Sequence, residues 1–358
     1  MLLNFLISFV KITIYINPKK KIQRMKHLWI IIILIFLVGC RTAGQTQDQG
    51  TPPPKTFPYK IYSVHEQVSG MDQVPRFLDA MDKAGISTMV LLGSPEATFI
   101  YVEGFQNHHD NNNQIMRIMH DFPGRFIAFP TIDPRNTSEL LAFQSYMNDG
   151  ATGLRLFSGQ WAWFYRYIGP VNRTELNPVF DYASDRNIPV MYNMNPGEGT
   201  LQAEFEDVLQ RYPDVKFVCP HFCLSSINST RFEYLMDTYP NLYTDISFGH
   251  FFEDGLKRIS RNTTKFHYLF DKYQNRIMFG ADMVITPNTG NSSEWIYNLT
   301  MCYRHMLEEK QYNCTVKIGK VFNVSARNLH GLALNDTMLK KIYHDNPEAW
   351  MGIGEEES

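Results

Sequence analysis

The sequence predicts an α/β protein built as a single (β/α)8 TIM barrel with extra C-terminal helices. From residue 60 onward, eight short runs rich in β-branched and aromatic residues alternate with longer stretches of helical periodicity. Successive runs begin about 30 residues apart, a spacing that suits right-handed βαβ crossovers. No Gly-x-Gly-x-x-Gly turn follows the first run, so an open doubly wound sheet is only the alternative.

The predicted strands are short and apolar. They cover Lys60–Val64, Thr88–Leu92, Phe126–Pro130, Gly153–Phe157, Pro189–Tyr192, Lys216–Cys219, Leu242–Ile246 and Arg276–Phe279. Apolar residues recur at helical spacing between them. The predicted helices cover Val74–Ala84, Asn113–Asp121, Ser138–Asn148, Asn177–Arg186, Glu204–Tyr212, Ser229–Tyr239 and Lys265–Tyr273.

Three more helices are expected after the last strand, where they would close or cover the barrel. They cover Glu294–Leu307, Val316–Leu332 and Asp336–Tyr343. The expected barrel domain is 58–347, followed by a tail, 348–358. No second domain is expected, because α/β barrels often use 200–250 residues or more as one domain.

The N-terminus has the pattern of an export signal. After basic residues comes an apolar run, Leu28–Val38, of 11 residues, which is short of the roughly 18 that span a bilayer. Leu37-Val38-Gly39-Cys40 resembles a bacterial lipobox, so residues 1–40 are predicted to be a signal peptide with Cys40 as the lipidated residue. Residues 1–24 would then be an upstream-start extension, and an uncleaved signal anchor is the alternative. Residues 41–57, rich in Thr, Gln, Gly and Pro, are predicted to be a flexible tether of an exported, membrane-anchored lipoprotein.

Charge argues against a nucleic-acid partner. Residues 1–40 contain six of the 34 Lys and Arg residues and no acidic residue, so the rest of the chain has 28 basic against 36 acidic side chains. Binding to phosphates requires clustered Lys and Arg. The expected partners are therefore a small-molecule substrate and, through the lipid on Cys40, the membrane.

Export would allow disulfides to persist. Cys302 and Cys314 are a possible pair, although connectivity does not follow from spacing. Cys219 is expected to be a small buried hydrophobe. Cys223, just past the sixth strand, is considered as a metal ligand.

Polar residues stand at the ends of four predicted strands. His65 ends the first and Asn193 the fifth, while His221 follows the sixth and Asp282 the eighth. Because the active site of a (β/α)8 barrel lies at the C-terminal ends of its strands, these side chains should converge on one mouth.

At these positions the chain resembles the amidohydrolase superfamily, in the branch that includes metal-dependent hydrolases and aminocarboxymuconate-semialdehyde-type decarboxylases. The resemblance covers about residues 60–347 and depends on landmarks in a fixed order. They are Tyr62-Ser63-Val64-His65-Glu66-Gln67, Arg125-Phe126-Ile127-Ala128-Phe129 with Asp133-Pro134-Arg135, Gly150-Ala151-Thr152-Gly153-Leu154-Arg155-Leu156, Ile188-Pro189-Val190-Met191-Tyr192-Asn193, Val215-Lys216-Phe217-Val218-Cys219-Pro220-His221 and Arg276-Ile277-Met278-Phe279-Gly280-Ala281-Asp282.

The resemblance implies a metal site, with departures. The family's first strand ends in Asp-x-His-x-His, and a His on strand five and an Asp on strand eight complete the ligand set. Mapped onto this chain, the metal positions are His65, Gln67, Asn193 and Asp282, so two imidazoles are replaced by amides. Amide oxygens are weaker donors for Zn²⁺ than imidazole, and a weakly bound divalent metal, or none, is expected.

Three functional interpretations remain open. The first is a metal-independent hydrolase of a small ester, lactone or amide, in which Asp282 is the general base and His221 stabilises the oxyanion. The second is an altered mononuclear metal site, with His65 and Asp282 as ligands and with further candidate ligands in Gln67, Asn193, His221 and Cys223. The third is a non-catalytic barrel that binds a ligand at the cell surface. A decarboxylase is the alternative among enzymes.

The remaining candidates concern the substrate. Arg155, on the fourth strand, is expected either to point into the mouth, where it would favour a carboxylate substrate, or to point outward as an ion-pair partner. Asn193 and Trp161, the latter in an aromatic loop after the fourth strand, are further predicted substrate contacts. His108, His109 and Asp110 look like a metal patch, but a solvated loop before the second helix is the preferred interpretation.

Overall fold

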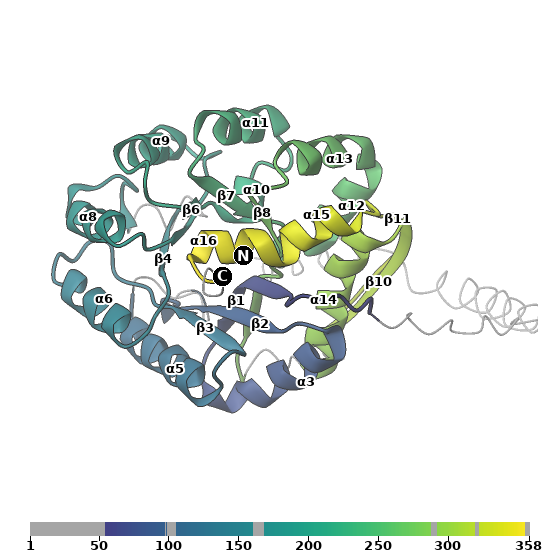
Figure 1. Cartoon of the computed structure of the whole chain (residues 1–358), viewed down its shortest axis with the longest axis horizontal. Helices are drawn as coiled ribbons and strands as arrows, with labels where there is room; N and C mark the ends of the chain where they lie inside the picture. Colours follow the sequence, from purple (N-terminus) through teal and green to yellow (C-terminus); the bar gives the residue numbers. More distant parts are fainter. Residues whose placement is uncertain are drawn as a thin grey trace, which may run out of the picture. The chain divides into compact units, whose positions relative to one another are not determined.

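Nine strands form the wall of a closed barrel, and helices surround it (Figure 1). The structure is a computed structural model that describes residues 54–96, 98, 105–159, 168–287, 292–318 and 322–354. The strands are β1 (Tyr62–Val68), β2 (Thr88–Leu92), β3 (Phe126–Phe129), β4 (Leu154–Gly159), β5 (Val190–Met194), β6 (Phe217–Val218), β7 (Leu242–Asp245), β8 (Ile277–Met278) and β9 (Met283–Ile285).

Neighbouring barrel strands pair in parallel, in the orders β3-β2-β1-β9 and β4-β5-β6-β7-β8. A bridge between Thr131 and Arg155 joins the two sections at one seam. At the other seam, the amide of Val64 donates to the carbonyl of Phe279 over 2.9 Å. These contacts close the barrel. Because β8 and β9 follow each other with no helix between them and pair with β7 and β1, they share the eighth position, and the predicted (β/α)8 fold class is confirmed.

The surrounding helices pack their apolar faces on the strands. They are α3 (Val74–Ala84), α5 (His108–Asp121), α6 (Glu139–Asn148), α8 (Asn177–Asp185), α9 (Leu201–Arg211), α11 (Ser229–Thr238), α12 (Phe252–Arg261), α13 (Thr263–Lys272) and α14 (Ser293–Glu308). The four-residue element α10 (Pro220–Cys223) is a turn directly after β6. In α3 the buried residues Phe77, Met81 and Ala84 recur at helical spacing. Gly85, at a φ of +67°, ends that helix in the left-handed conformation that glycine adopts without strain.

The predicted helix over Val316–Leu332 is wrong. The structure has an antiparallel hairpin there, formed by β10 (Gln311–Ile318) and β11 (Phe322–His330). Along β10 exposed and buried residues alternate, with Tyr312, Cys314 and Val316 facing inward. This period of two is a strand signal. The predicted disulfide between Cys302 and Cys314 is present and ties β10 to α14.

The C-terminal segment covers the end of the barrel where the strands begin (Figure 1). It consists of α15 (Asp336–Lys340), a π-helical turn (Lys341–Asp345) and α16 (Asn346–Met351). Trp350 is fully buried, and its Nε1 donates to the carbonyl of Lys216 over 3.2 Å. The predicted tail from residue 348 is therefore part of the barrel up to this helix, because Trp350 fills space between the strands.

The N-terminal predictions largely fall on residues that the structure does not describe. These include the signal peptide, Cys40 and the tether up to residue 53, so export and lipidation stay predictions. The compact barrel unit begins at Pro54. Phe57 packs on its core and Lys55 bonds the carbonyl of Glu308, so the last residues of the predicted tether belong to the barrel. Across the described ranges, we find no helix long and apolar enough to cross a membrane.

Candidate active site

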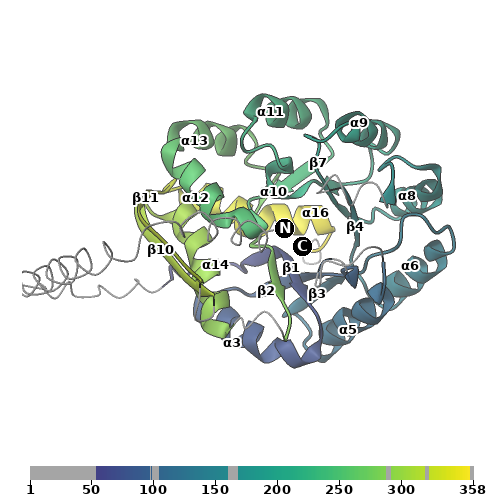
Figure 2. The same cartoon turned by 180° about the vertical axis from the view of Figure 1, so that it is seen from behind.

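The predicted strand-end residues meet at the end of the barrel opposite α16. Figure 2 shows the molecule from the side opposite to that of Figure 1. His65 comes from β1, His221 from α10 after β6, and Asp282 from the link between β8 and β9. Because parallel strands bring their C-terminal ends to one edge, side chains more than 200 residues apart in sequence become neighbours.

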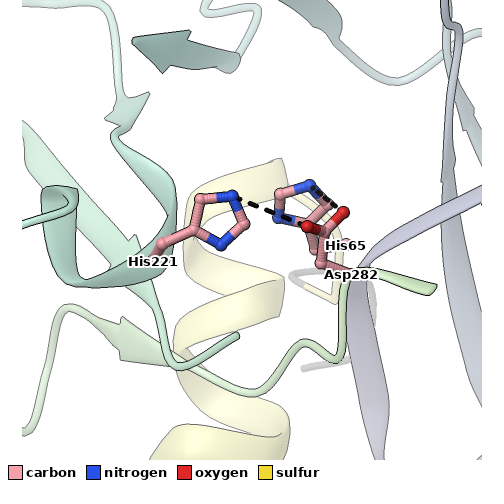
Figure 3. Close-up of side chains that lie close together, drawn as sticks. All are labelled: His65, His221 and Asp282. Atoms are coloured by element: carbon pink, nitrogen blue, oxygen red, sulfur yellow. Dashed lines mark ion pairs between the residues drawn. The ribbon is translucent and has the colours of Figure 1, made fainter. Parts of the chain in front are cut away.

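His65, His221 and Asp282 form the centre of the site (Figure 3). The Nε2 atom of His65 lies 3.1 Å from Oδ1 of Asp282, and Nε2 of His221 lies 3.7 Å from Oδ2. Both imidazoles are almost completely buried, whereas the Asp282 side chain is 13% exposed. The carboxylate is therefore the part of this trio that solvent reaches most easily.

The other ring nitrogen of each histidine has a fixed acceptor. Nδ1 of His65 lies 2.7 Å from Oδ2 of Asp245. Nδ1 of His221 lies 2.8 Å from Oγ of Ser247 and 3.2 Å from its carbonyl oxygen. The hydroxyl of Ser247 donates its own proton to Asp245, so both of its oxygens accept from His221. The proton of each neutral imidazole is thus on Nδ1, and the lone pair is on Nε2.

Neither Nε2 atom makes a hydrogen bond to any part of the chain that the structure describes. At His65 the contact with Asp282 is short, but it lacks the direction of a hydrogen bond. When both imidazoles are neutral, their two Nε2 lone pairs and the carboxylate beside them, all within 4.8 Å of one another, form a suitable donor set for one divalent ion. Acceptors on both Nδ1 atoms are also typical of metal-bound histidines.

Asp245, at the end of β7, organises this centre and was missed in the sequence analysis. Besides its bond to His65, it accepts from the backbone amides of His221, at 3.0 Å, and of Ser247, at 2.9 Å. A carboxylate one residue before the end of a predicted strand, Leu242–Ile246, was the available signal. The sequence could not show that its partners come from β1 and from the turn after β6.

His221 and Asp282 lie on unusual backbone. Four consecutive residues, from His221 to Leu224, have φ between +46° and +62°, and Asp282 has a φ of +50°. Such left-handed conformations cost roughly 1–2 kcal/mol per residue without glycine. A disulfide between Cys219 and Cys223 closes the strained turn at His221, and the amide of Asp282 is bonded to the carbonyl of His65 over 2.8 Å.

The disulfide corrects two expectations. Cys219 is not a free buried hydrophobe, and Cys223 is not available as a metal ligand, because the two sulfur atoms are bonded to each other. The left-handed conformation of His221 and Phe222 turns the chain back towards the end of β6, so Cys223 comes to lie beside Cys219. The predicted sixth strand ended at Cys219, and the sequence did not show that the chain turns back and brings Cys223 beside it.

A second group of polar residues extends the site towards β4 and β5. The amide nitrogen of Gln67 donates to Oδ1 of Asp282 over 2.8 Å, and its oxygen accepts from Ser94 at 2.8 Å. Arg155 points inward, donating through Nη1 to Ser94 and through Nε to Asn193. The oxygens of Gln67 and Asn193 are thus occupied, so His221 takes their place beside His65 and Asp282 in the potential ligand set.

Charge sets the protonation of the centre when no ion is bound. Burial alone would lower the pKa of His65, but the carboxylates of Asp282 and Asp245 outweigh it and raise the pKa to about 10. Burial would raise the pKa of both carboxyls, yet His65 holds both below their usual range. Burial lowers the pKa of His221. A proton and a metal ion would therefore compete for Nε2 of His65.

Arg155 carries the other positive charge of the site. Burial lowers its pKa to about 10, against the opposing effect of Asp282, so it is charged at neutral pH. Its bonds to Ser94, Asn193 and the carbonyl of Gly93 use Nη1 and Nε. Within the described ranges, Nη2 has no hydrogen-bond partner. Trp161 falls within 160–167, outside the described residues.

Comparisons with known proteins agree with this architecture. A family model described as Amidohydrolase matches residues 80–353. An uncharacterized TIM-barrel protein from Bordetella bronchiseptica is 16% identical, with a TM-score of 0.56 over 82% of this chain and 100% of that one. The 2,6-dihydroxybenzoate decarboxylase from Rhizobium is 12% identical, with a TM-score of 0.52 over 82% of this chain and 99% of that one. No curated protein matches the chain. At these identities the likenesses show the fold alone.

Proposed function

Because this chain belongs to the amidohydrolase family, we propose that it hydrolyses a small ester, lactone or amide that carries a carboxylate group. One observation carries the proposal: the buried Nε2 atoms of His65 and His221 both face the carboxylate of Asp282, at the strand ends. That arrangement can hold an ion or activate a water molecule. Packing of the barrel does not require these polar side chains to meet.

His65, His221 and Asp282 would hold the ion, and the chain supplies no further free imidazole at β5. A divalent ion in such a site polarises a carbonyl group or lowers the pKa of a bound water. With Asn193 in place of an imidazole, we expect weak binding that dialysis reverses.

Asp282 is the proposed general base. It is the most exposed member of the trio, and Gln67 holds one of its oxygens, so the other can accept a proton from the attacking water. The predicted oxyanion role of His221 requires a proton on Nε2, but its neutral form carries that proton on Nδ1. The geometry therefore favours metal binding as the role of His221.

Arg155 is the proposed binding group for the substrate carboxylate. A guanidinium held by Asn193 and Ser94 is preorganised, and Nη2, which has no hydrogen-bond partner among the described residues, can complete an ion pair with a carboxylate. Burial strengthens this attraction because the surroundings have a low dielectric constant.

The test is a hydrolysis screen over small lactones, esters and amides, with and without a carboxylate, using the full chain. For any substrate found, Asp282→Asn should lower kcat by about 10²–10⁴-fold, while Asp185→Asn on the outer helix α8 should not. Circular dichroism spectra would confirm that both variants fold. Unchanged turnover in Asp282→Asn would reject Asp282 as the base. Ligand binding without turnover across the screen would favour the non-catalytic alternative.

A second prediction concerns the metal. Chelation followed by dialysis should lower activity at least tenfold, and added Zn²⁺ should restore it in the native chain but not in His221→Asn. Metal content is measured on the same samples. Full activity with less than about 0.05 ions per chain would instead support the metal-independent alternative.

A decarboxylase remains the second candidate, because an inward-pointing arginine can also hold the carboxylate that is lost. The two reactions give different products. Release of CO2 from a carboxylate substrate, with no incorporation of ¹⁸O from labelled water into the product, would identify decarboxylation. Incorporation of ¹⁸O without CO2 release would identify hydrolysis.

A further inference from the structure

A second cluster of potential ligands lies at the N-terminal ends of two outer helices, α5 and α6. His108 and His109 are the first two residues of α5, and Glu139 is the first residue of α6. The preferred interpretation of this stretch as a solvated loop is wrong for His108, which is only 6% exposed and helical. The third member of the cluster is Glu139, whereas Asp110 is exposed.

Both histidines point the same nitrogen at one carboxylate. Nε2 of His108 lies 3.1 Å from Oε2 of Glu139, and Nε2 of His109 lies 3.1 Å from Oε1. The centroids of the two rings are 3.9 Å apart, and the ring planes are inclined to each other by 37°. Their nitrogens and the carboxylate oxygens are within 4.8 Å of one another.

The opposite ring nitrogens are occupied by oxygen atoms of the chain. Nδ1 of His108 faces the carbonyl of Phe105 at 2.5 Å, and Nδ1 of His109 faces the hydroxyl of Tyr146 at 3.4 Å. A carbonyl oxygen can only accept, so His108 carries a proton on Nδ1. In its neutral form, His108 therefore directs the lone pair of Nε2 at a buried carboxylate, and that arrangement needs a positive charge between them.

A metal ion is one such charge, and the surroundings suit it. The nearby carboxylate of Asp133 is held by Arg135, which leaves Glu139 to the histidines. His108 and Glu139 are buried, while the side chain of His109 is 46% exposed. An ion could therefore enter from solvent and keep water in its remaining positions.

We propose that His108, His109 and Glu139 form a second binding site for a divalent transition-metal ion such as Zn²⁺ or Co²⁺. Two imidazoles and one carboxylate are a common donor set for these ions. The ion would tie the first turn of α5 to the first turn of α6, so its role is structural. The proposal does not depend on the function proposed for the barrel mouth.

The test is Co²⁺ and Zn²⁺ binding to the full chain, produced without a histidine tag. Co²⁺ bound by imidazoles absorbs visible light, and thermal unfolding gives a second readout. Zn²⁺ should raise the melting temperature of the native chain. In His109→Asn and Glu139→Gln, the Kd should increase at least tenfold and this rise in melting temperature should disappear. Removing a group that only hydrogen-bonds to a metal ligand typically weakens metal affinity 10–100-fold, and removing the ligand itself should weaken it at least as much.

Two controls separate this site from other binding. His120 lies further along α5, is exposed and pairs with Asp149. His120→Asn should therefore leave metal binding unchanged. His221→Asn removes a ligand of the active-site cluster and should leave the thermal effect intact. The proposal is overturned if the native chain binds no ion, or if His109→Asn and Glu139→Gln bind as the native chain does. In that case, a protonated His108 supplies the charge that pairs with Glu139.

Discussion

Single hydrogen bonds decide what the active-site residues can do. Asp245 and Ser247 fix the Nδ1 protons of His65 and His221, and the two Nε2 lone pairs are left beside Asp282. The roles of these histidines therefore follow from their acceptors more than from their own identity. Residue type alone would allow either histidine to be a donor, a base or a ligand.

The approach of Gly249 to Asp282 gives a prediction at the same scale. A Cβ atom on Gly249 would lie 2.5 Å from Oδ2 of Asp282, so Gly249→Ala must displace the carboxylate. Misplacing a catalytic group by about 1 Å can lower the rate about 10²-fold. We expect kcat to fall by that order, measured with the substrate that the screen identifies.

Gly199 provides the matched control. Its φ of +50° is close to the +52° of Gly249, but an added Cβ would meet no atom within 4 Å. Gly199→Ala should suffer the same backbone strain and keep its activity. Equal losses of activity in both variants would mean that backbone strain, and not the contact with Asp282, is responsible.

At the scale of elements, the turn after β6 is the least ordinary part of the fold. It holds His221 on left-handed backbone, and the Cys219–Cys223 disulfide joins its two ends. Strained conformations persist when the surrounding structure over-determines them. Here the disulfide and the hydrogen bond that the amide of His221 donates to Asp245 provide that constraint.

Removing this disulfide should impair function more than it impairs folding. In the double variant Cys219→Ala, Cys223→Ala, we expect activity to fall at least about tenfold as His221 moves. The double variant Cys302→Ala, Cys314→Ala is the comparison, because that disulfide joins α14 to β10. It should lose roughly 2–4 kcal/mol of stability and retain activity in its folded fraction. The reverse pattern of activities would show that His221 is positioned without the Cys219–Cys223 disulfide.

At the scale of the whole molecule, the apolar packing around Trp350 and the polar active site lie at opposite ends of the barrel. Apolar side chains inside the barrel pack around Trp350 at the end where the strands begin. The ring of Phe129 lies 4.9 Å from that of Trp350. The polar groups of the active site lie at the other end, so changes at α16 should leave them in place.

This separation can be tested by Trp350→Ala. Loss of a fully buried tryptophan should lower the free energy of unfolding by about 3–5 kcal/mol, as measured in urea. The KM of the folded protein should not change. Leu141→Ala, at a side chain that is 72% exposed, should change stability by less than about 0.5 kcal/mol. A large change in KM for Trp350→Ala would show that the two ends are coupled.

Most of the fold could be predicted because its signals are local. The strands around Thr88–Leu92 and Leu242–Asp245 were identified from short apolar runs, and α3 from helical spacing. The hairpin at 311–330 was missed because its alternation was interpreted as the last part of a helical series. Helix α5 begins at His108, five residues before the predicted start, since its first turn is polar and its contacts lie on α6.

The sequence by itself determined the order of the barrel units and the presence of His65, His221 and Asp282 at strand ends. Both follow from short stretches of sequence, because a strand's periodicity and its residues do not depend on distant segments. Only the tertiary structure decided that Arg155 points inward, that Asp245 orients His65, and that Cys219 pairs with Cys223. Those relations depend on strand register, on the hand of one turn and on contacts between distant segments. Such properties arise only when the barrel closes.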